Sequence, residues 1–92
     1  EGKVWIDCGY GVSLFTYDNE TFGLYCYTND GCAPLNFNIH VNGKISKLEK
    51  IPETDEENPW WKKDVEPLYS NDKESVFPIR MIPGDFAFFK MV

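Results

Sequence analysis

Residues 35–41 alternate without interruption between apolar and polar side chains, and this pattern is the strongest constraint on the fold. A period of two is typical of a β-strand that has one face on a core and the other toward water. The apolar face comprises Leu35, Phe37, Ile39 and Val41, and the polar face comprises Asn36, Asn38 and His40. We therefore expect an antiparallel sheet with one wet face.

The dipeptide Asn42-Gly43 follows this strand directly, and it is the strongest short signal for a two-residue β-hairpin. Such a hairpin pairs Phe37 with Leu48 on the core face. It also places His40 opposite Ile45 on the outer face, where Ile45 and Ile51 could pack under a second layer or form part of an exposed contact patch.

A second hairpin is predicted at Pro83-Gly84, which fits the central positions of a type II turn. With Met81 opposite Phe86, this hairpin places Phe86 and Phe88 on the core face. The same alternation leaves Ala87 on the outer face.

Similar strand signals recur along the whole chain, interrupted by a short helical or loop insertion near residues 58–67. About seven strands without alternating helices indicate a mainly β protein. We predict that residues 1–92 form a single small antiparallel β-sandwich, with an immunoglobulin-like or Greek-key arrangement.

Charge and motifs exclude several functions for this chain of 92 residues and formal net charge −6. An acidic chain lacks the basic surface that phosphate backbones require, so no nucleic-acid partner is expected. No apolar run is long enough for a membrane span, and the first residues run straight into a strand rather than forming a signal peptide. We see no Gly-rich phosphate loop, Ser-centred elbow or metal motif, so we expect no enzyme activity, cofactor or metal.

Three cysteines, Cys8, Cys26 and Cys32, allow at most one internal disulfide and leave one thiol, with the pairing open. A disulfide favours an extracellular, secreted protein, in which the odd thiol could link two copies. Three reduced thiols would instead be typical of a cytoplasmic protein, and a non-covalent oligomer is compatible with either location. The sequon Asn19-Glu20-Thr21 lies in a predicted turn, which makes Asn19 a glycosylation candidate.

The clearest binding candidates are aromatic side chains without an obvious place in the core. Trp60 and Trp61 lie in a charged loop, where both cannot easily point inward, and Trp is enriched at binding hot spots. Tyr25 and Tyr27 share one face of a strand and could stack on sugar rings or contact a protein. The full set of predicted partner-contact residues is Trp60, Trp61, Tyr25, Tyr27, His40 and Ile45.

These features favour a non-enzymatic, secreted or cell-surface recognition module that binds a protein partner through the aromatic loop or an edge strand. A second hypothesis is a carbohydrate-binding module that stacks sugars on its Tyr and Trp side chains. A third is an acidic inhibitor, immunity or effector protein that occupies a basic partner surface through residues 53–57.

Several segments resemble the N-terminal module of zona pellucida domains. They are the first strand ending in Cys8, the alternating segment 12–18, Cys32-Ala-Pro-Leu35 before a strand, and Val76-Phe-Pro-Ile79. The resemblance covers about half of the chain and implies a small immunoglobulin-like sandwich of the kind found in egg coats and secreted filaments. That module is held by two disulfides, whereas this chain has three cysteines, so the segments do not assign the family.

Overall fold

A computed structural model describes residues 3–8, 10–27, 35–51 and 64–92, and these residues form eight β-strands and no helix. The prediction of a mainly β chain is confirmed, with eight strands where about seven were expected. The strands are β1 (Val4–Ile6), β2 (Val12–Thr16), β3 (Thr21–Cys26), β4 (Leu35–Asn42), β5 (Leu48–Ile51), β6 (Tyr69–Ser70), β7 (Glu74–Met81) and β8 (Phe86–Met91).

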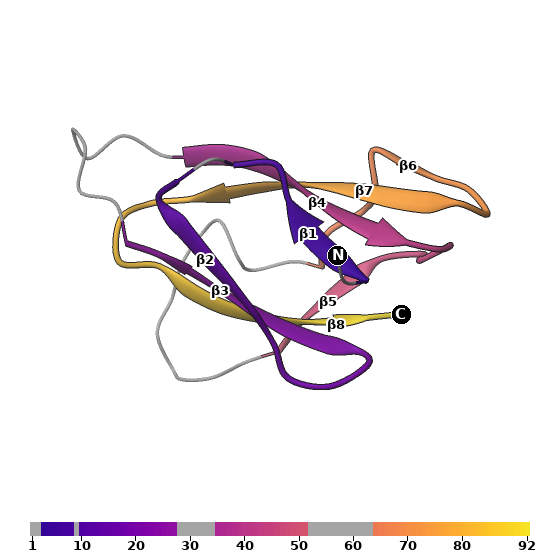
Figure 1. Cartoon of the computed structure of the whole chain (residues 1–92), viewed down its shortest axis with the longest axis horizontal. Coiled ribbons are helices and arrows are strands. Elements are labelled where there is room, and N and C mark those ends of the chain that lie inside the picture. Colours follow the sequence, from indigo (N-terminus) through magenta and orange to yellow (C-terminus); the bar gives the residue numbers. More distant parts are fainter. Residues whose placement is uncertain (1–2, 9, 28–34, 52–63) are drawn as a thin grey trace.

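The strands form two antiparallel sheets of four strands each. Sheet A has the order β1-β4-β7-β6, and sheet B has the order β2-β3-β8-β5. Figure 1 shows β4 beside β7 in one sheet and β3 beside β8 in the other. Because the chain switches repeatedly between the sheets, the predicted small β-sandwich is confirmed.

The core lies between the two sheets and is built from alternate residues of each strand. On β4, Phe37, Ile39 and Val41 are buried, as the alternation predicts. From sheet B, the rings of Phe22 and Phe89 meet with centroids 5.7 Å apart, and both residues have 0% exposure. Each fully buried side chain of this size contributes about 1.5–3 kcal/mol through the hydrophobic effect. The burial of both inner faces is therefore the main source of stability.

The chain bends at Gly43, but the two-residue hairpin turn predicted at Asn42-Gly43 does not form, and the Gly43 amide donates to the carbonyl oxygen of Lys73 at 2.9 Å instead. Gly43 has a φ of 105°, the left-handed region that favours glycine. After this bend the chain crosses to the other sheet, so Phe37 pairs with Ile79, and Leu48 pairs with Met91. The predicted register was wrong because a local bend sets the direction of the chain, whereas burial of the apolar face selects the partner strand.

The turn at Pro83-Gly84 also joins strands of different sheets and not the two strands of a hairpin. The amide of Asp85 donates to the carbonyl oxygen of Ile82 at 3.0 Å, which closes the predicted turn. The strands on either side of it belong to different sheets, since Met81 pairs with Leu35 and Phe86 pairs with Tyr25. The predicted row of pairs between β7 and β8 is therefore wrong.

A helix in the predicted insertion is not borne out where the structure describes it. Val65 forms an isolated β-bridge with Leu48, with N–H···O distances of 2.9 Å in both directions. Residues 64–67 are therefore not helical, and residues 58–63 lie outside the described residues. No helix long and apolar enough to cross a membrane occurs among the described residues.

Candidate functional site

The outer face of sheet B carries a cluster of aromatic side chains, here called the aromatic face. Its members are Phe15, Tyr25, Tyr27, Phe86 and Phe88. Phe15 is 39% exposed, and Tyr27 and Phe86 are each 50% exposed. A contiguous apolar cluster on the surface is a candidate for a contact surface.

A glycine makes room for these rings. In the register of sheet B, Gly23 lies between Phe15 on β2 and Phe88 on β8. A Cβ atom at this position would overlap both phenylalanine rings. The rings therefore pack over the bare backbone of β3, a known way in which aromatic side chains cover a glycine in a sheet.

The rings of the aromatic face meet edge to face. Phe86 contacts Phe15 at a centroid distance of 5.7 Å and an interplanar angle of 72°, and it contacts Phe88 at 5.2 Å and 64°. Phe15 and Phe88 meet at 6.0 Å and 89°. Such pairs contribute about 0.5–1.5 kcal/mol each beyond their burial. The cluster is therefore an apolar surface whose rings hold one another in place through edge-to-face contacts.

The outer face of sheet A has the opposite character and is here called the polar face. Its residues come from β1, β4 and β7 and from the segment after β1. They are Trp5, Asp7, Asn36, Asn38, His40, Glu74 and Arg80. Since the apolar residues of β4 point inward, its amide and imidazole side chains stand on this face.

Asp7 organises the centre of the polar face. Its carboxylate accepts the backbone N–H of Asn38 at 2.8 Å and the side-chain amide of Asn38 at 3.1 Å. The Nε2 atom of His40 lies 3.3 Å from the same carboxylate. Burial by itself would raise the pKa of Asp7, but these hydrogen bonds and the nearby imidazole outweigh it and lower the pKa. Asp7 therefore stays ionised and holds both neighbours in place.

His40 lies between Trp5 on β1 and Val76 on β7. Its ring stacks on the indole of Trp5, with centroids 3.9 Å apart and planes inclined by 7°. The Nδ1 atom of His40 is buried and lies 3.7 Å from Glu74 Oε1. Glu74 in turn accepts a hydrogen bond from Tyr69 Oη at 2.5 Å, which raises the pKa of Tyr69. One face of the indole is thus covered, while 42% of Trp5 stays exposed.

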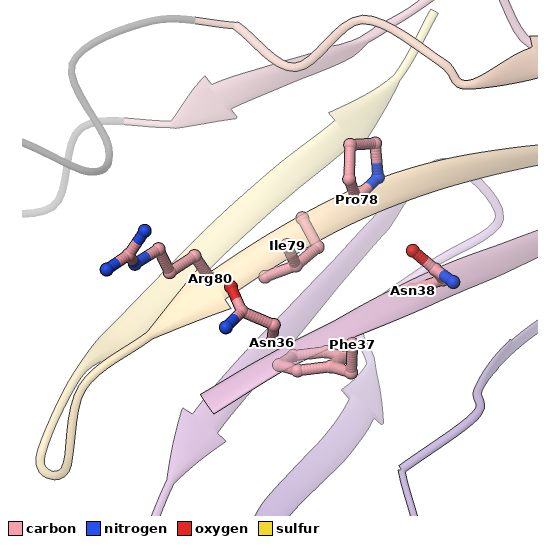
Figure 2. A pocket seen from close by; sticks show the side chains of 6 residues that line it. All are labelled: Asn36, Phe37, Asn38, Pro78, Ile79 and Arg80. Carbon is pink, nitrogen blue, oxygen red and sulfur yellow. The ribbon is translucent and has the colours of Figure 1, made fainter. Parts of the chain in front are cut away.

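A shallow hollow of about 290 Å³ lies beside this network, between β4 and β7. Figure 2 shows Asn36 and Asn38 along one strand and Pro78 and Arg80 along the other. Phe37 and Ile79, whose side chains belong to the core, complete the lining. Its volume is just below the range of small-molecule sites, which run from roughly 300 to 1,000 Å³.

The polar groups of the polar face suit binding better than metal coordination. Within residues 3–8, 10–27, 35–51 and 64–92, no group of three or more His, Cys, Asp or Glu side chains is arranged to hold a metal ion. Amide groups supply paired donors and acceptors, and a guanidinium group supplies a planar fork of donors. The arrangement can therefore hydrogen-bond a polar ligand without a metal.

Two of the predicted contact residues lie together in the structure, beside phenylalanines that were predicted to lie in the core. Tyr25 and Tyr27 both belong to the aromatic face, with ring centroids 6.5 Å apart. Phe86 and Phe88, predicted in the core, stand on this outer face, and Ala87 is buried instead. The prediction was wrong because β8 is apolar on both sides, so its alternation does not reveal which side faces inward. Trp60 and Trp61 lie outside the described residues.

His40 and Ile45, the two other predicted contact residues, are not paired with each other. His40 stands on the polar face, whereas Ile45 is partly buried against the core. The backbone N–H of Ile45 donates to Ser75 Oγ at 2.8 Å, which fixes the segment after Gly43. Whether either residue contacts a partner stays a prediction.

Two of the three cysteines and the asparagine of the sequon lie among the described residues. Cys26 is buried on β3 and Cys8 is partly buried after β1, with no disulfide between them, and the Cys8 thiol donates to the Tyr10 carbonyl oxygen at 2.7 Å. Cys32 lies outside the described residues. Asn19 is exposed in the turn between β2 and β3, as a glycosylation site requires. Disulfide formation and glycosylation stay predictions.

Trp5 is the functional candidate that the sequence reasoning missed. It stands between Val4 and Ile6, both of which point toward the core. The alternation of this short strand could have placed Trp5 on the wet face, since its neighbours are the inward residues. Its partner His40 could not have been found, because β1 and β4 are far apart in sequence.

Comparison with known families gives a match over almost the whole chain. A family model described as “Probable glycosyl hydrolase, C-terminal domain” matches residues 3–91. Comparisons with curated proteins and with solved structures give no match.

This match contradicts the predicted recognition module. A secreted or cell-surface module that binds a protein partner was expected from the aromatic side chains alone, whereas the family model ties almost the whole chain to a glycoside hydrolase. The segments that resemble the zona pellucida module are short by comparison. They reflect a β-sandwich pattern that unrelated families share.

Proposed function

Because the chain belongs to the family of C-terminal domains of probable glycosyl hydrolases, we propose that it is a non-catalytic accessory domain of such an enzyme. We propose that its aromatic face packs against the hydrolase unit of the same polypeptide and holds the two units together. The observation that carries this proposal is the exposed, braced cluster on sheet B.

The composition of the aromatic face supports packing against another protein surface. Three of its five members are phenylalanines, which bring no hydroxyl group for hydrogen bonding to a polar ligand. In each edge-to-face pair one ring directs its edge at the face of the other, so part of the ring-face area is used within the cluster. A stacking platform for sugars needs open ring faces, whereas an apolar protein surface packs well against edges.

The carboxylates of the polar face support a non-catalytic role. Most glycosidases use one carboxyl group as an acid with a raised pKa and a second as a nucleophile or base. Asp7 has a lowered pKa and is engaged by Asn38 and His40. Glu74 accepts the hydrogen bond of Tyr69. Both carboxylates are committed to holding the sheet surface, so we assign the catalytic pair to the hydrolase unit.

The proposal is tested in the full-length hydrolase that carries this domain, with the double variant Phe15→Ser/Phe86→Ser. Loss of the apolar contact should lower the melting temperature of the hydrolase unit and split a shared unfolding transition into two. Calorimetry on the full-length enzyme measures both effects. Leu68→Ser is the matched control, because Leu68 is 60% exposed beside sheet A and lies outside the aromatic face.

An unchanged melting profile in the double variant would overturn the proposal, provided that the isolated 92-residue chain carrying the same substitutions keeps its own cooperative unfolding. If the Leu68→Ser control lowered the melting temperature as much as the double variant, the aromatic face would not be the specific contact. Hydrolysis of a small soluble substrate should continue in every variant, since the catalytic groups are assigned to the other unit.

A further inference from the structure

The polar face is a second candidate binding surface, separate from the aromatic face. The aromatic face lies on the outside of sheet B and the polar face on the outside of sheet A, so the two are on opposite sides of the sandwich. Packing of one face against the hydrolase unit would leave the other open to a ligand.

Trp5 supplies an open aromatic surface at one side of the polar face. One side of its ring is covered by His40 at 3.9 Å, and the planes are nearly parallel. Trp5 as a residue is 42% exposed, and His40 is the one ring stacked on it among the described residues. A flat ring fixed by a stack on one side can receive the C–H face of a sugar ring on the other.

The hollow between β4 and β7 supplies the hydrogen bonds. Asn36 and Asn38 stand on the same side of β4, about 7 Å apart as successive outward residues of a strand. Within the part of the chain that the structure describes, the side chain of Asn36 makes no hydrogen bond, and that of Asn38 uses one amide donor toward Asp7. The amide oxygens and the remaining donors are therefore available to hydroxyl groups.

Asp7 fixes the geometry of this surface before any ligand arrives. It holds the Asn38 amide at 3.1 Å and the His40 imidazole at 3.3 Å, and the imidazole holds Trp5. A surface whose side chains are already ordered loses less conformational entropy on binding. The network thus connects the stacking ring to the hydrogen-bonding hollow.

The charges favour a neutral ligand. The polar face combines one guanidinium, Arg80, with the two carboxylates Asp7 and Glu74, and the whole chain carries a formal charge of −6. A polyanionic ligand would meet net repulsion, whereas an uncharged polyhydroxyl chain would not. A glycan was among the partners that the sequence left open.

We infer that the polar face binds a neutral oligosaccharide chain, with one sugar ring on Trp5 and neighbouring hydroxyl groups bonded to Asn36 and Asn38. The choice of carbohydrate as the ligand class rests on the proposed function. Bound in this way, the accessory domain keeps the substrate chain near the hydrolase unit without taking part in the reaction.

The experiment is an NMR titration of the 92-residue chain with neutral hexaoses of β-1,4-glucose, β-1,4-xylose, β-1,4-mannose and β-1,3-glucose, each up to about 10 mM. At least one hexaose should shift the indole N–H signal of Trp5 and the side-chain amide signals of Asn36 and Asn38. Trp5→Ala and Asn36→Ala should each weaken this binding about tenfold, while Tyr10→Ala, an exposed aromatic change outside both faces, should not.

Three results would overturn the inference: no shifts with any hexaose, shifts confined to sheet B, or binding that Trp5→Ala and Asn36→Ala leave unchanged. Binding to a polygalacturonate fragment alone would contradict the neutral ligand. Trp5→Phe keeps an aromatic ring, so it should recover part of the affinity if Trp5→Ala disturbs β1. This titration uses the isolated chain, whereas the calorimetry uses the full-length enzyme. A negative titration therefore does not contradict the packing of the aromatic face, and a negative calorimetric result does not contradict glycan binding.

Discussion

The indole of Trp5 and the imidazole of His40 lie flat against each other, with centroids 3.9 Å apart and an interplanar angle of 7°. The two residues are paired in the register of β1 and β4, so the stack joins an edge strand to the strand beside it. β1 has only three residues, and a strand of that length gains little from its backbone ladder alone. The stack is therefore a main attachment of β1 to sheet A.

We expect His40→Ala to destabilise the chain by about 1 kcal/mol, because the stack of two aromatic rings is lost from an edge strand. Urea unfolding at pH 7 measures the change in the free energy of unfolding. Lys44→Ala, an exposed change just beyond β4, serves as the control. A His40→Ala chain as stable as the parent would show that β1 is held by its backbone pairing and by Val4 and Ile6 alone.

Asp7→Asn should reduce stability at neutral pH and have little effect in acid. The folded chain lowers the pKa of Asp7 below its ordinary value of 3.8. A lowered pKa means that this carboxylate stabilises the fold above pH 3.8 and that its contribution fades as the pH falls through the lower folded value. The gap between parent and variant should therefore shrink between pH 7 and pH values well below 3.8.

Urea midpoints at a series of pH values measure this gap. Asp72→Asn, which makes the same change in the exposed turn before β7, is the matched control. A gap for Asp7→Asn that stayed constant down to the lowest pH would mean that the carboxylate contributes through packing and not through its charge.

Ser75→Ala should destabilise the chain by about 1–3 kcal/mol, because it leaves two part-buried backbone groups without their hydrogen-bond partner. Ser75 has 0% exposure; its Oγ accepts the N–H of Ile45 at 2.8 Å and donates to the carbonyl oxygen of Gly43 at 2.8 Å. Thermal unfolding measures the loss, and the exposed Ser13→Ala serves as the reference. Equal melting temperatures for the two variants would show that the hydrogen bonds of Ser75 do not stabilise the segment in which the chain crosses from sheet A to sheet B.

Gly43→Ala should cost about 1–2 kcal/mol, because φ is 105° and a Cβ is disfavoured in the left-handed region. Nothing lies within 4 Å of the Cβ position, so the cost is in the backbone and not in a clash. Gly43→Asn should cost less, since asparagine tolerates this region better. Urea unfolding ranks the three chains, and an alanine variant no weaker than the asparagine variant would contradict the backbone explanation.

The orientation of β4 in sheet A could be predicted from the alternation in residues 35–41. Phe37, Ile39 and Val41 are buried, and Asn36, Asn38 and His40 form the outer face. This prediction holds because a strand with one apolar side can be buried in one way only. The same reasoning failed for β8, where Phe86 and Phe89 are both apolar but face opposite sides.

The candidate sites were less predictable than the strands. Tyr25 and Tyr27 were identified as contact candidates, but their neighbours Phe15 and Phe86 were not, because these come from other strands of sheet B. The polar face is likewise assembled from segments that are distant in the sequence. Asp7 and Asn38 are 31 residues apart in the chain, yet the Asn38 backbone nitrogen lies 2.8 Å from the Asp7 carboxylate. Short-range patterns carry no information on such pairs.

The β-character of the chain, the turn at Pro83-Gly84 and the buried side of β4 could be predicted from the residues alone, because they follow from backbone preferences and from the period of the side chains. The crossings between sheets at Asn42-Gly43 and Pro83-Gly84 could not, because they depend on how the two sheets pack. Strand pairing is selected by the joint burial of two apolar faces, which depends on all eight strands at once. That selection placed phenylalanines on one outer face and amides with Trp5 on the other.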